Sequence, residues 1–201
     1  MNRVKTFRVA AWAAVAVVSA GLAAAMVLRS GPSAPPSSVS GTAAVGGAFS
    51  LTSQRGSVVT DRSLRGKPYL AFFGFTNCPD ICPTTLFELT TMMAELGAEA
   101  DKFNVLLISV DPERDSQEVL AEYMTAFDPR IIALRGTRAQ TDAAVKAFAA
   151  TAVKVPLEGG TYTMEHTAGV YLMDAAGRYA GLMRMEEPKQ ERMRKLRDLI
   201  G

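Results

Sequence analysis

Two long apolar runs constrain the fold of this chain more than any other feature of its sequence. Residues 69–75 and 105–110 are nearly continuous in apolar side chains, which is typical of strands buried on both faces. Between the two runs, Cys82, Leu86 and Leu89 recur at helical spacing. This strand–helix–strand order predicts a mostly parallel sheet whose two faces are covered by helices.

The remaining pattern completes an α/β domain with extra hairpins. The further elements that we expect are a hairpin over 49–60, a helix capped at Asp115, a strand over 131–134, a helix from Thr137 through Phe148, hairpin strands over 170–173 and 179–185, and a last helix opened by Pro188. Residues 156–161 are rich in glycine and are expected to form a mobile loop. In open sheets of this kind, ligands bind beyond the carboxyl ends of the strands.

The amino-terminal part of the chain predicts a membrane anchor. Residues 9–28 carry no charge, and a helix of this length is roughly 30 Å long, enough to cross a bilayer core. A cleaved signal peptide is the alternative, because small residues at 23–25 offer a cleavage site. We therefore expect an anchor over 1–29, a flexible tether over 30–46 and a single domain over 47–201.

The distribution of charge places the domain outside the cytoplasm. Three basic residues precede the apolar segment and one follows it, which keeps the amino terminus inside and exports the rest. The whole chain is +2 and residues 1–46 carry four basic and no acidic side chains, which leaves −2 for the domain. This balance argues against a nucleic-acid partner. The prediction is a single-pass protein of the bacterial cytoplasmic membrane whose domain faces the periplasm.

Cys78 and Cys82 are the only cysteines, and His166 is the only histidine. Both cysteines lie at a predicted helix start, where backbone N–H groups and the helix dipole favour thiolates of low pKa. Cys82 belongs to the apolar helix face and should be the more buried. If the strand at Val170 runs antiparallel to residues 69–75, His166 reaches the same sheet edge. Two thiolates and an imidazole are an incomplete zinc site and a complete three-coordinate copper site.

Each of these residues also has a structural interpretation. The cysteines could form a stabilising disulfide, although so short a loop gains little from chain entropy. A lone histidine is often a hydrogen-bonded core residue. Asp111 follows a strand end and could bond to a metal ligand, whereas Asp115 fits a helix N-cap. Of the ten methionines, Met164 lies nearest in sequence to His166.

Four segments together resemble the Sco/SenC family. They are Gly74-Phe75-Thr76-Asn77-Cys78-Pro79-Asp80-Ile81-Cys82-Pro83, Ser109-Val110-Asp111-Pro112-Glu113-Arg114-Asp115, Gly136-Thr137-Arg138 and Glu165-His166-Thr167. The resemblance implies a thioredoxin-like fold, membrane anchoring, and copper held by Cys78, Cys82 and His166. It also implies a link between an acidic residue, matched here by Asp111, and the copper site. Asn77 departs from the family, because many members have histidine there.

The function implied by the resemblance is that of a copper metallochaperone. It would hold Cu(I) or Cu(II) and deliver it to the binuclear copper site of cytochrome c oxidase subunit II or another copper protein. Other copper carriers or thiol reductants would be further partners. The alternative is a thiol–disulfide oxidoreductase in which Cys78 and Cys82 form a redox-active pair that reduces the cysteines of that site.

Two features of the sequence favour metal binding over thiol–disulfide exchange. Three residues separate the cysteines, whereas thioredoxin-like redox motifs have two. No proline stands just before Val170, where thioredoxins place one, and the sole histidine falls there instead. A metallochaperone is a binding protein and needs no catalytic turnover.

Overall fold

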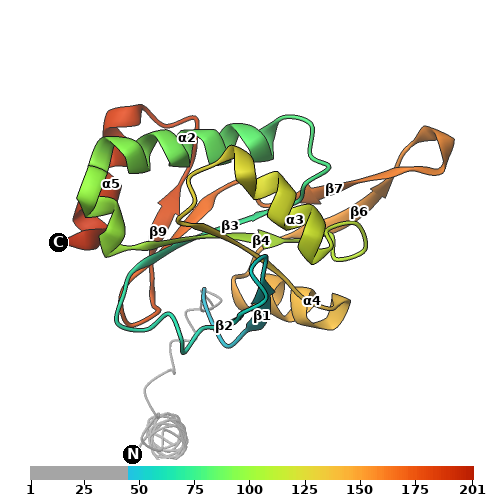
Figure 1. Ribbon diagram of the computed structural model, residues 1–201, viewed down its shortest axis with the longest axis horizontal. Helices are drawn as coiled ribbons and strands as arrows, with labels where there is room; N and C mark the ends of the chain where they lie inside the picture. The colour runs from blue at the N-terminus through green and yellow to red at the C-terminus, as the bar shows by residue number, and fades with distance from the viewer. Residues whose placement is uncertain (1–44) are drawn as a thin grey trace, which may run out of the picture. The chain divides into compact units, whose positions relative to one another are not determined.

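The computed structural model describes residues 45–201, which contain a seven-stranded sheet and a separate two-stranded one (Figure 1). The large sheet has the order β2-β1-β5-β4-β3-β8-β9. Its strands are β1 (Ser50–Ser53), β2 (Val58–Thr60), β3 (Tyr69–Gly74), β4 (Asn104–Ser109), β5 (Ile131–Arg135), β8 (Val170–Met173) and β9 (Tyr179–Met183). The small sheet pairs β6 (Ala152–Pro156) with β7 (Tyr162–His166). The helices are α2 (Ile81–Leu96), α3 (Gln117–Tyr123), α4 (Arg138–Ala147) and α5 (Lys189–Ile200).

Strand β3 lies inside the sheet and every one of its residues is buried. It pairs in parallel with β4 on one side and antiparallel with β8 on the other. Phe73 on β3 contacts Phe148 and Tyr171, with ring centroids 5.4 and 5.8 Å away and edge-to-face geometry. Burial on both faces explains why the sequence of this strand is apolar throughout rather than alternating.

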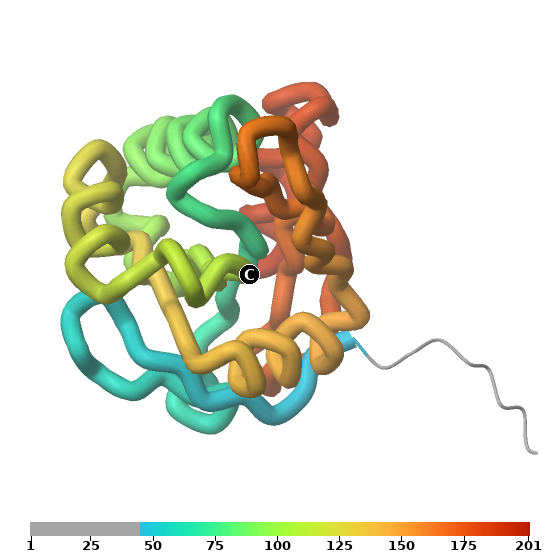
Figure 2. The backbone as a smooth tube through the Cα atoms, turned by 90° about the vertical axis from the view of Figure 1, so that its right-hand side faces the viewer, coloured from blue at the N-terminus to red at the C-terminus, as the bar shows by residue number. Residues whose placement is uncertain are grey.

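The helices cover the two faces of the sheet unequally. Helices α2, α3 and α5 lie on one face and α4 on the other (Figures 1 and 2). The chain moves from β3 to β4 to β5 in one direction, so right-handed crossovers place α2 and α3 on the same face. The apolar face predicted for α2 is confirmed, because Cys82, Leu86 and Leu89 are all buried.

Of the two predicted helix N-caps, the one at α4 is confirmed and the one at α3 is wrong. Thr137 forms the predicted capping box with Gln140 at the start of α4. At α3 the N-cap is Ser116, whose hydroxyl accepts a hydrogen bond from the backbone N–H of Val119. The prediction that Asp115 caps this helix is wrong, because its carboxylate is buried and bonded to other segments.

The small sheet is the main departure from the predicted elements. Strands β6 and β7 form a hairpin ahead of His166 that projects beyond the large sheet (Figure 1). The loop expected over 156–161 lies at the tip of this hairpin. Only a single residue of the two strands, Met164, is buried. Because most of the hairpin is exposed, the apolar alternation by which half-buried strands are found is short, and in β7 it rests on only two residues, Tyr162 and Met164.

The predicted anchor over 1–29 and nearly all of the tether over 30–46 lie outside the described residues. Within residues 45–201, no helix is both long enough and apolar enough to cross a bilayer. The predicted division of the chain into anchor, tether and domain therefore stays a prediction.

Gly136, between β5 and α4, should be difficult to replace because its surroundings are tight. A Cβ atom there would lie 2.7 Å from Leu51 Cδ2 and 2.7 Å from Gln140 Cβ. We expect Gly136→Ala to lower the free energy of unfolding by about 1–3 kcal/mol, the usual effect of overpacking. Urea unfolding followed by circular dichroism measures the change.

Gly181→Ala is the matched control for this substitution. Its added Cβ would meet only Leu172 Cδ1, at 3.9 Å, and Gly181 lies in strand β9. A gain or no change in stability is expected for Gly181→Ala, because glycine weakens strand interiors. Equal effects of the two substitutions would contradict the packing argument.

Candidate metal centre

Three segments bring their soft side chains together at one edge of the large sheet. Cys78 lies in the loop after β3, Cys82 in the first turn of α2, and His166 at the end of β7. The two Sγ atoms and a ring nitrogen lie within 4.8 Å of one another. His166 Nε2 is 3.4 Å from Cys82 Sγ. Strand β8 is antiparallel to β3, so the chain that leads into Val170 arrives at this edge, as predicted.

The two sulfur atoms differ in exposure, as the sequence predicted. Cys82 is fully buried and Cys78 is partly exposed, and both are free thiols. The backbone N–H of Cys82 donates to Cys78 Sγ at 3.4 Å. Below them, a Cβ atom at Gly74 would lie 3.1 Å from Cys82 Sγ, so a glycine is what leaves room for the buried sulfur.

The protonation of Cys82 differs from the sequence expectation. Burial raises the pKa of this thiol well above its usual range, with Cys78 adding to the effect. The expected lowering of the pKa is therefore wrong for Cys82, because loss of hydration outweighs the backbone hydrogen bond at Phe75, which lowers it. In the free protein Cys82 is a thiol, and it must lose its proton to become a metal ligand.

His166 is held with one defined nitrogen toward the sulfurs. Its Nδ1 lies 3.1 Å from the carbonyl oxygen of Thr167. A carbonyl can only accept, so Nδ1 carries the proton and Nε2 presents its lone pair to Cys82. Burial lowers the pKa of His166, which keeps the ring neutral near pH 7. The rings of Phe72 and Phe75 meet the imidazole at near right angles, 5.9 and 5.8 Å from centroid to centroid.

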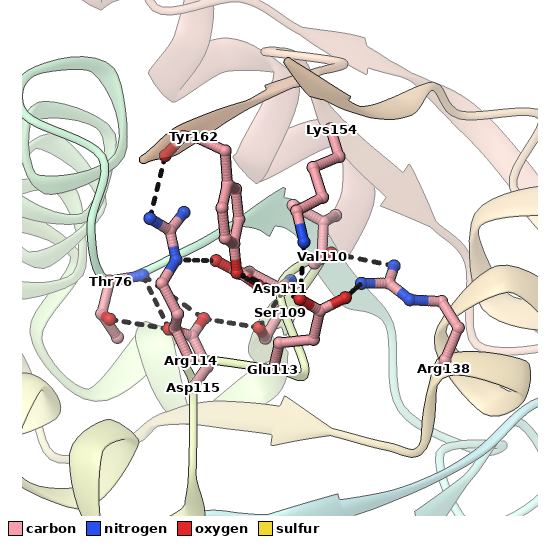
Figure 3. A network of polar contacts seen from close by, with 10 residues as sticks. All are labelled: Thr76, Ser109, Val110, Asp111, Glu113, Arg114, Asp115, Arg138, Lys154 and Tyr162. Carbon is pink, nitrogen blue, oxygen red and sulfur yellow. Dashed lines mark hydrogen bonds and ion pairs between the residues drawn. The ribbon is translucent and has the colours of Figure 1, made fainter. Parts of the chain in front are cut away.

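Asp115 is a residue whose role in the site the sequence did not reveal. Its buried carboxylate accepts from the hydroxyl of Thr76 at 2.7 Å, from the backbone N–H of Thr76 at 3.3 Å and from Ser109 Oγ (Figure 3). Burial raises the pKa of Asp115, although these hydrogen bonds oppose the rise. Since Thr76 lies two residues before Cys78, Asp115 ties the cysteine loop to the end of β4.

Asp111 lies on the same segment but faces the hairpin. Among residues 45–201, its carboxylate bonds the guanidinium of Arg114 and the hydroxyl of Tyr162, the latter at 2.9 Å. It therefore reaches the strand that carries His166 through Tyr162 rather than by contact with the imidazole. A functional link between Asp111 and the metal site stays a prediction.

A groove of about 410 Å³ is lined by two of the three donor residues, Cys78 and His166, whereas Cys82 is buried behind it. Its lining includes Phe75, Cys78, Ile81, Met164 and His166. Ile81 is half-exposed, whereas Met164 is buried against the core. The groove gives the Cys78 sulfur access from outside, so a second molecule can approach a metal bound there.

The arrangement suits a soft metal ion. Thiolate sulfur and imidazole nitrogen are donors preferred by copper, and three of them satisfy a trigonal copper ion. A structural zinc ion takes four protein ligands, and residues 45–201 place only these three together. The donor set therefore fits copper better than zinc.

The sequence matches a known protein family over all of residues 45–201. The family model described as SCO1/SenC matches residues 37–201. The mitochondrial protein SCO2 of Saccharomyces cerevisiae is 35% identical over 163 residues, which cover 80% of this chain and 54% of that relative. The chain thus spans about half the length of this relative.

Two solved structures resemble the domain closely. ScoI of Bradyrhizobium japonicum with copper bound is 44% identical, with a TM-score of 0.73, and the match covers 78% of this chain and 99% of that one. BsSco, described as a Sco-family cytochrome c oxidase assembly protein with a disulfide switch, is 26% identical. Its TM-score is 0.62, and the match covers 79% of this chain and 95% of that one.

The difference between the two thiols predicts a difference in reactivity. At pH 7.5, iodoacetamide should modify Cys78 at least about tenfold faster than Cys82, which is buried and protonated. Raising the pH by one unit should speed the Cys82 reaction about tenfold, because its thiolate fraction rises in proportion. Peptide mapping of the variants Cys82→Ser and Cys78→Ser measures each rate without disulfide formation. Equal rates in the two variants would contradict the assigned burial.

Proposed function

Because the chain belongs to the SCO1/SenC family, we propose that it is a copper-binding protein of cytochrome c oxidase assembly. The observation that carries the proposal is the convergence of Cys78 Sγ, Cys82 Sγ and a ring nitrogen of His166 within 4.8 Å. The copper-bound structure of the Bradyrhizobium japonicum relative supports the choice of metal. In this proposal the three residues are the copper ligands.

The two oxidation states of copper use these ligands differently. Cu(I) is soft and is satisfied by two thiolates, so Cys78 and Cys82 suffice for it. Cu(II) requires nitrogen as well, and the neutral Nε2 of His166 supplies it. Binding releases the proton of Cys82, since a ligand sulfur is a thiolate. The site therefore binds either state, with His166 deciding how well it holds Cu(II).

Copper leaves the site by ligand exchange in this proposal. A thiolate of the acceptor enters the groove, bonds to copper and displaces the exposed Cys78, and Cys82 and His166 follow. The acceptor is the binuclear copper site of cytochrome c oxidase subunit II or another copper protein. Upstream copper carriers and thiol reductants complete the cycle. The domain would work in the periplasm, attached to the bacterial cytoplasmic membrane by residues 1–29.

The second candidate function is reduction of a disulfide in the acceptor. Cys78 thiolate would attack the acceptor disulfide, and Cys82 would then resolve the mixed disulfide, leaving a Cys78–Cys82 disulfide and an acceptor dithiol. The disulfide switch described for BsSco favours this reaction. The raised pKa of Cys82 disfavours it, because a resolving thiol must be ionised.

Replacement of the imidazole tests the proposed ligand set. We expect His166→Ala to weaken Cu(II) binding at least about tenfold and to alter the thiolate-to-copper charge-transfer absorption, with Cu(I) binding nearly unchanged. The measurement is anaerobic copper titration of the full chain in detergent. Met164→Leu keeps a similar apolar volume on the same strand and is the control. An unaltered spectrum for His166→Ala would remove His166 from the ligand set.

Oxidation of the cysteine pair tests the role of the sulfurs. In the Cys78–Cys82 disulfide neither sulfur is a thiolate, so copper uptake should fall by about tenfold or more. Dialysis against Cu(I) followed by metal analysis, before and after reduction with a phosphine, measures the uptake. Full uptake by the oxidised protein would show that copper binds elsewhere.

A further inference from the structure

The hairpin β6–β7 carries His166, yet the large sheet does not hold it in place. The two strands pair only with each other within residues 45–201. The ladder is flanked by hydrogen bonds from Thr167 N–H to Thr151 C=O and from Leu157 N–H to Thr161 C=O. Antiparallel pairs alternate, so Tyr162, Met164 and His166 direct their backbone groups away from β6. This free edge needs other contacts to fix it.

Side chains along β7 show how the strand lies against the domain. Successive residues of a strand point to opposite faces, so Tyr162, Met164 and His166 share one face. Met164 is buried and His166 meets Cys82, so this face is the inner one. Tyr162 contacts the segment after β4 (Figure 3). The strand therefore rests on the domain at three successive points, and Tyr162 is the outermost.

We propose that Arg114 and Tyr162 form a clamp that positions His166 for copper. Arg114 Nη1 donates to the carbonyl oxygen of Tyr162 at 2.9 Å, which satisfies one acceptor on the free edge of β7. The guanidinium carbon of Arg114 lies 3.7 Å from the centroid of the Tyr162 ring. The inference rests on the proposed function, in which His166 is a copper ligand.

Asp111 makes the clamp rigid. Its fully buried carboxylate bonds Arg114 Nε and accepts from the Tyr162 hydroxyl at 2.9 Å, so it fixes both members of the clamp (Figure 3). The charged guanidinium compensates the buried carboxylate. Lys154 on β6 lies 3.9 Å from the centroid of the Tyr162 ring and bonds Glu113 at 2.6 Å. One short segment after β4 thus contacts both strands of the hairpin.

The same segment also holds the cysteine loop, through the bonds of Asp115 to Thr76. Residues 111–115 therefore set the position of the imidazole relative to the sulfurs. Loosening the bond to Thr76 would disturb the sulfurs, whereas loosening the clamp would displace only His166. A positioning role thus has its own signature, which is weaker Cu(II) binding with Cu(I) binding retained.

The main variant removes the ion pair without leaving a buried charge. In Asp111→Asn with Arg114→Gln, both side chains become neutral; asparagine keeps the size of Asp111, and glutamine is shorter than Arg114 but keeps an N–H donor. We expect Cu(II) affinity to fall 10- to 100-fold, the usual effect of losing a group that orients a ligand. Cu(I) affinity should stay within about threefold. Each tenfold loss for Cu(II) alone raises the reduction potential of bound copper by about 59 mV.

The control is a more exposed arginine–aspartate pair far from the hairpin. Arg130 bonds Asp128 at 2.7 and 3.0 Å and precedes β5, at the opposite sheet edge. Asp128→Asn with Arg130→Gln should leave both copper affinities unchanged. Tyr162→Leu is the second clamp variant, since Tyr162 is partly exposed and its loss leaves Asp111 paired with Arg114. It should show a selective loss of Cu(II) affinity that is smaller than that of the double variant, because the backbone carbonyl of residue 162 still accepts from Arg114. This variant tests the clamp if the double variant does not fold.

The measurements use the full chain in detergent, with His166→Ala titrated alongside. His166 is the only histidine, so its Cε1–H group gives one unambiguous signal in proton–carbon spectra of the metal-free protein. That signal should shift toward the unfolded position in the clamp variants and not in the control. Equal losses for Cu(I) and Cu(II), or no loss, would overturn the clamp while His166→Ala still shows a selective effect. No effect of His166→Ala would overturn the proposed ligand set together with the clamp.

Discussion

The pairing of β3 with one parallel and one antiparallel neighbour is the constraint on which the site depends. Parallel pairing with β4 brings the segment after Ser109 to the edge where Cys78 lies. Antiparallel pairing with β8 brings the segment before Val170 to that same edge. Cys82 and His166 are 84 residues apart along the chain, and this sheet topology makes them neighbours. Burial of β3 on both faces stabilises the arrangement through the apolar area removed from water.

Burial has a second effect, because it sets the chemistry of the ligands. The same loss of hydration raises the pKa of Cys82 and lowers that of His166, so both of these groups are neutral in the metal-free protein. A neutral imidazole needs no counter-charge and tolerates the apolar rings of Phe72 and Phe75 beside it. When Cys82 becomes a metal ligand it releases its proton, and the negative charge of the resulting thiolate offsets part of the positive charge of the ion.

The helices and strands that were predicted correctly are those whose sequence pattern extends over only a few neighbouring residues. The strands of the large sheet, the apolar face of α2 and the capping box at Thr137 agree with the structure, because burial periodicity and cap chemistry act over a few residues. The meeting of Cys78, Cys82 and His166 followed from one assumption about strand direction. The hairpin β6–β7 escaped prediction, because its position depends on contacts with a segment some 50 residues earlier. The same holds for the inward turn of Asp115 and for the pKa of Cys82, which depend on tertiary burial.

The short segment from Asp111 to Asp115 contacts both the cysteine loop and the strand that carries His166. Two buried carboxylates four residues apart would repel each other and cost free energy unless each were bonded. Asp111 is bonded by a guanidinium and a phenol, and Asp115 by two hydroxyls and a backbone N–H. Those donors come from the cysteine loop, from β7, from the end of β4 and from the segment itself, so satisfying the carboxylates requires both ligand-bearing segments to be in place. The free energy that would be lost by leaving either carboxylate unpaired is therefore what couples the sulfur side of the site to the imidazole side.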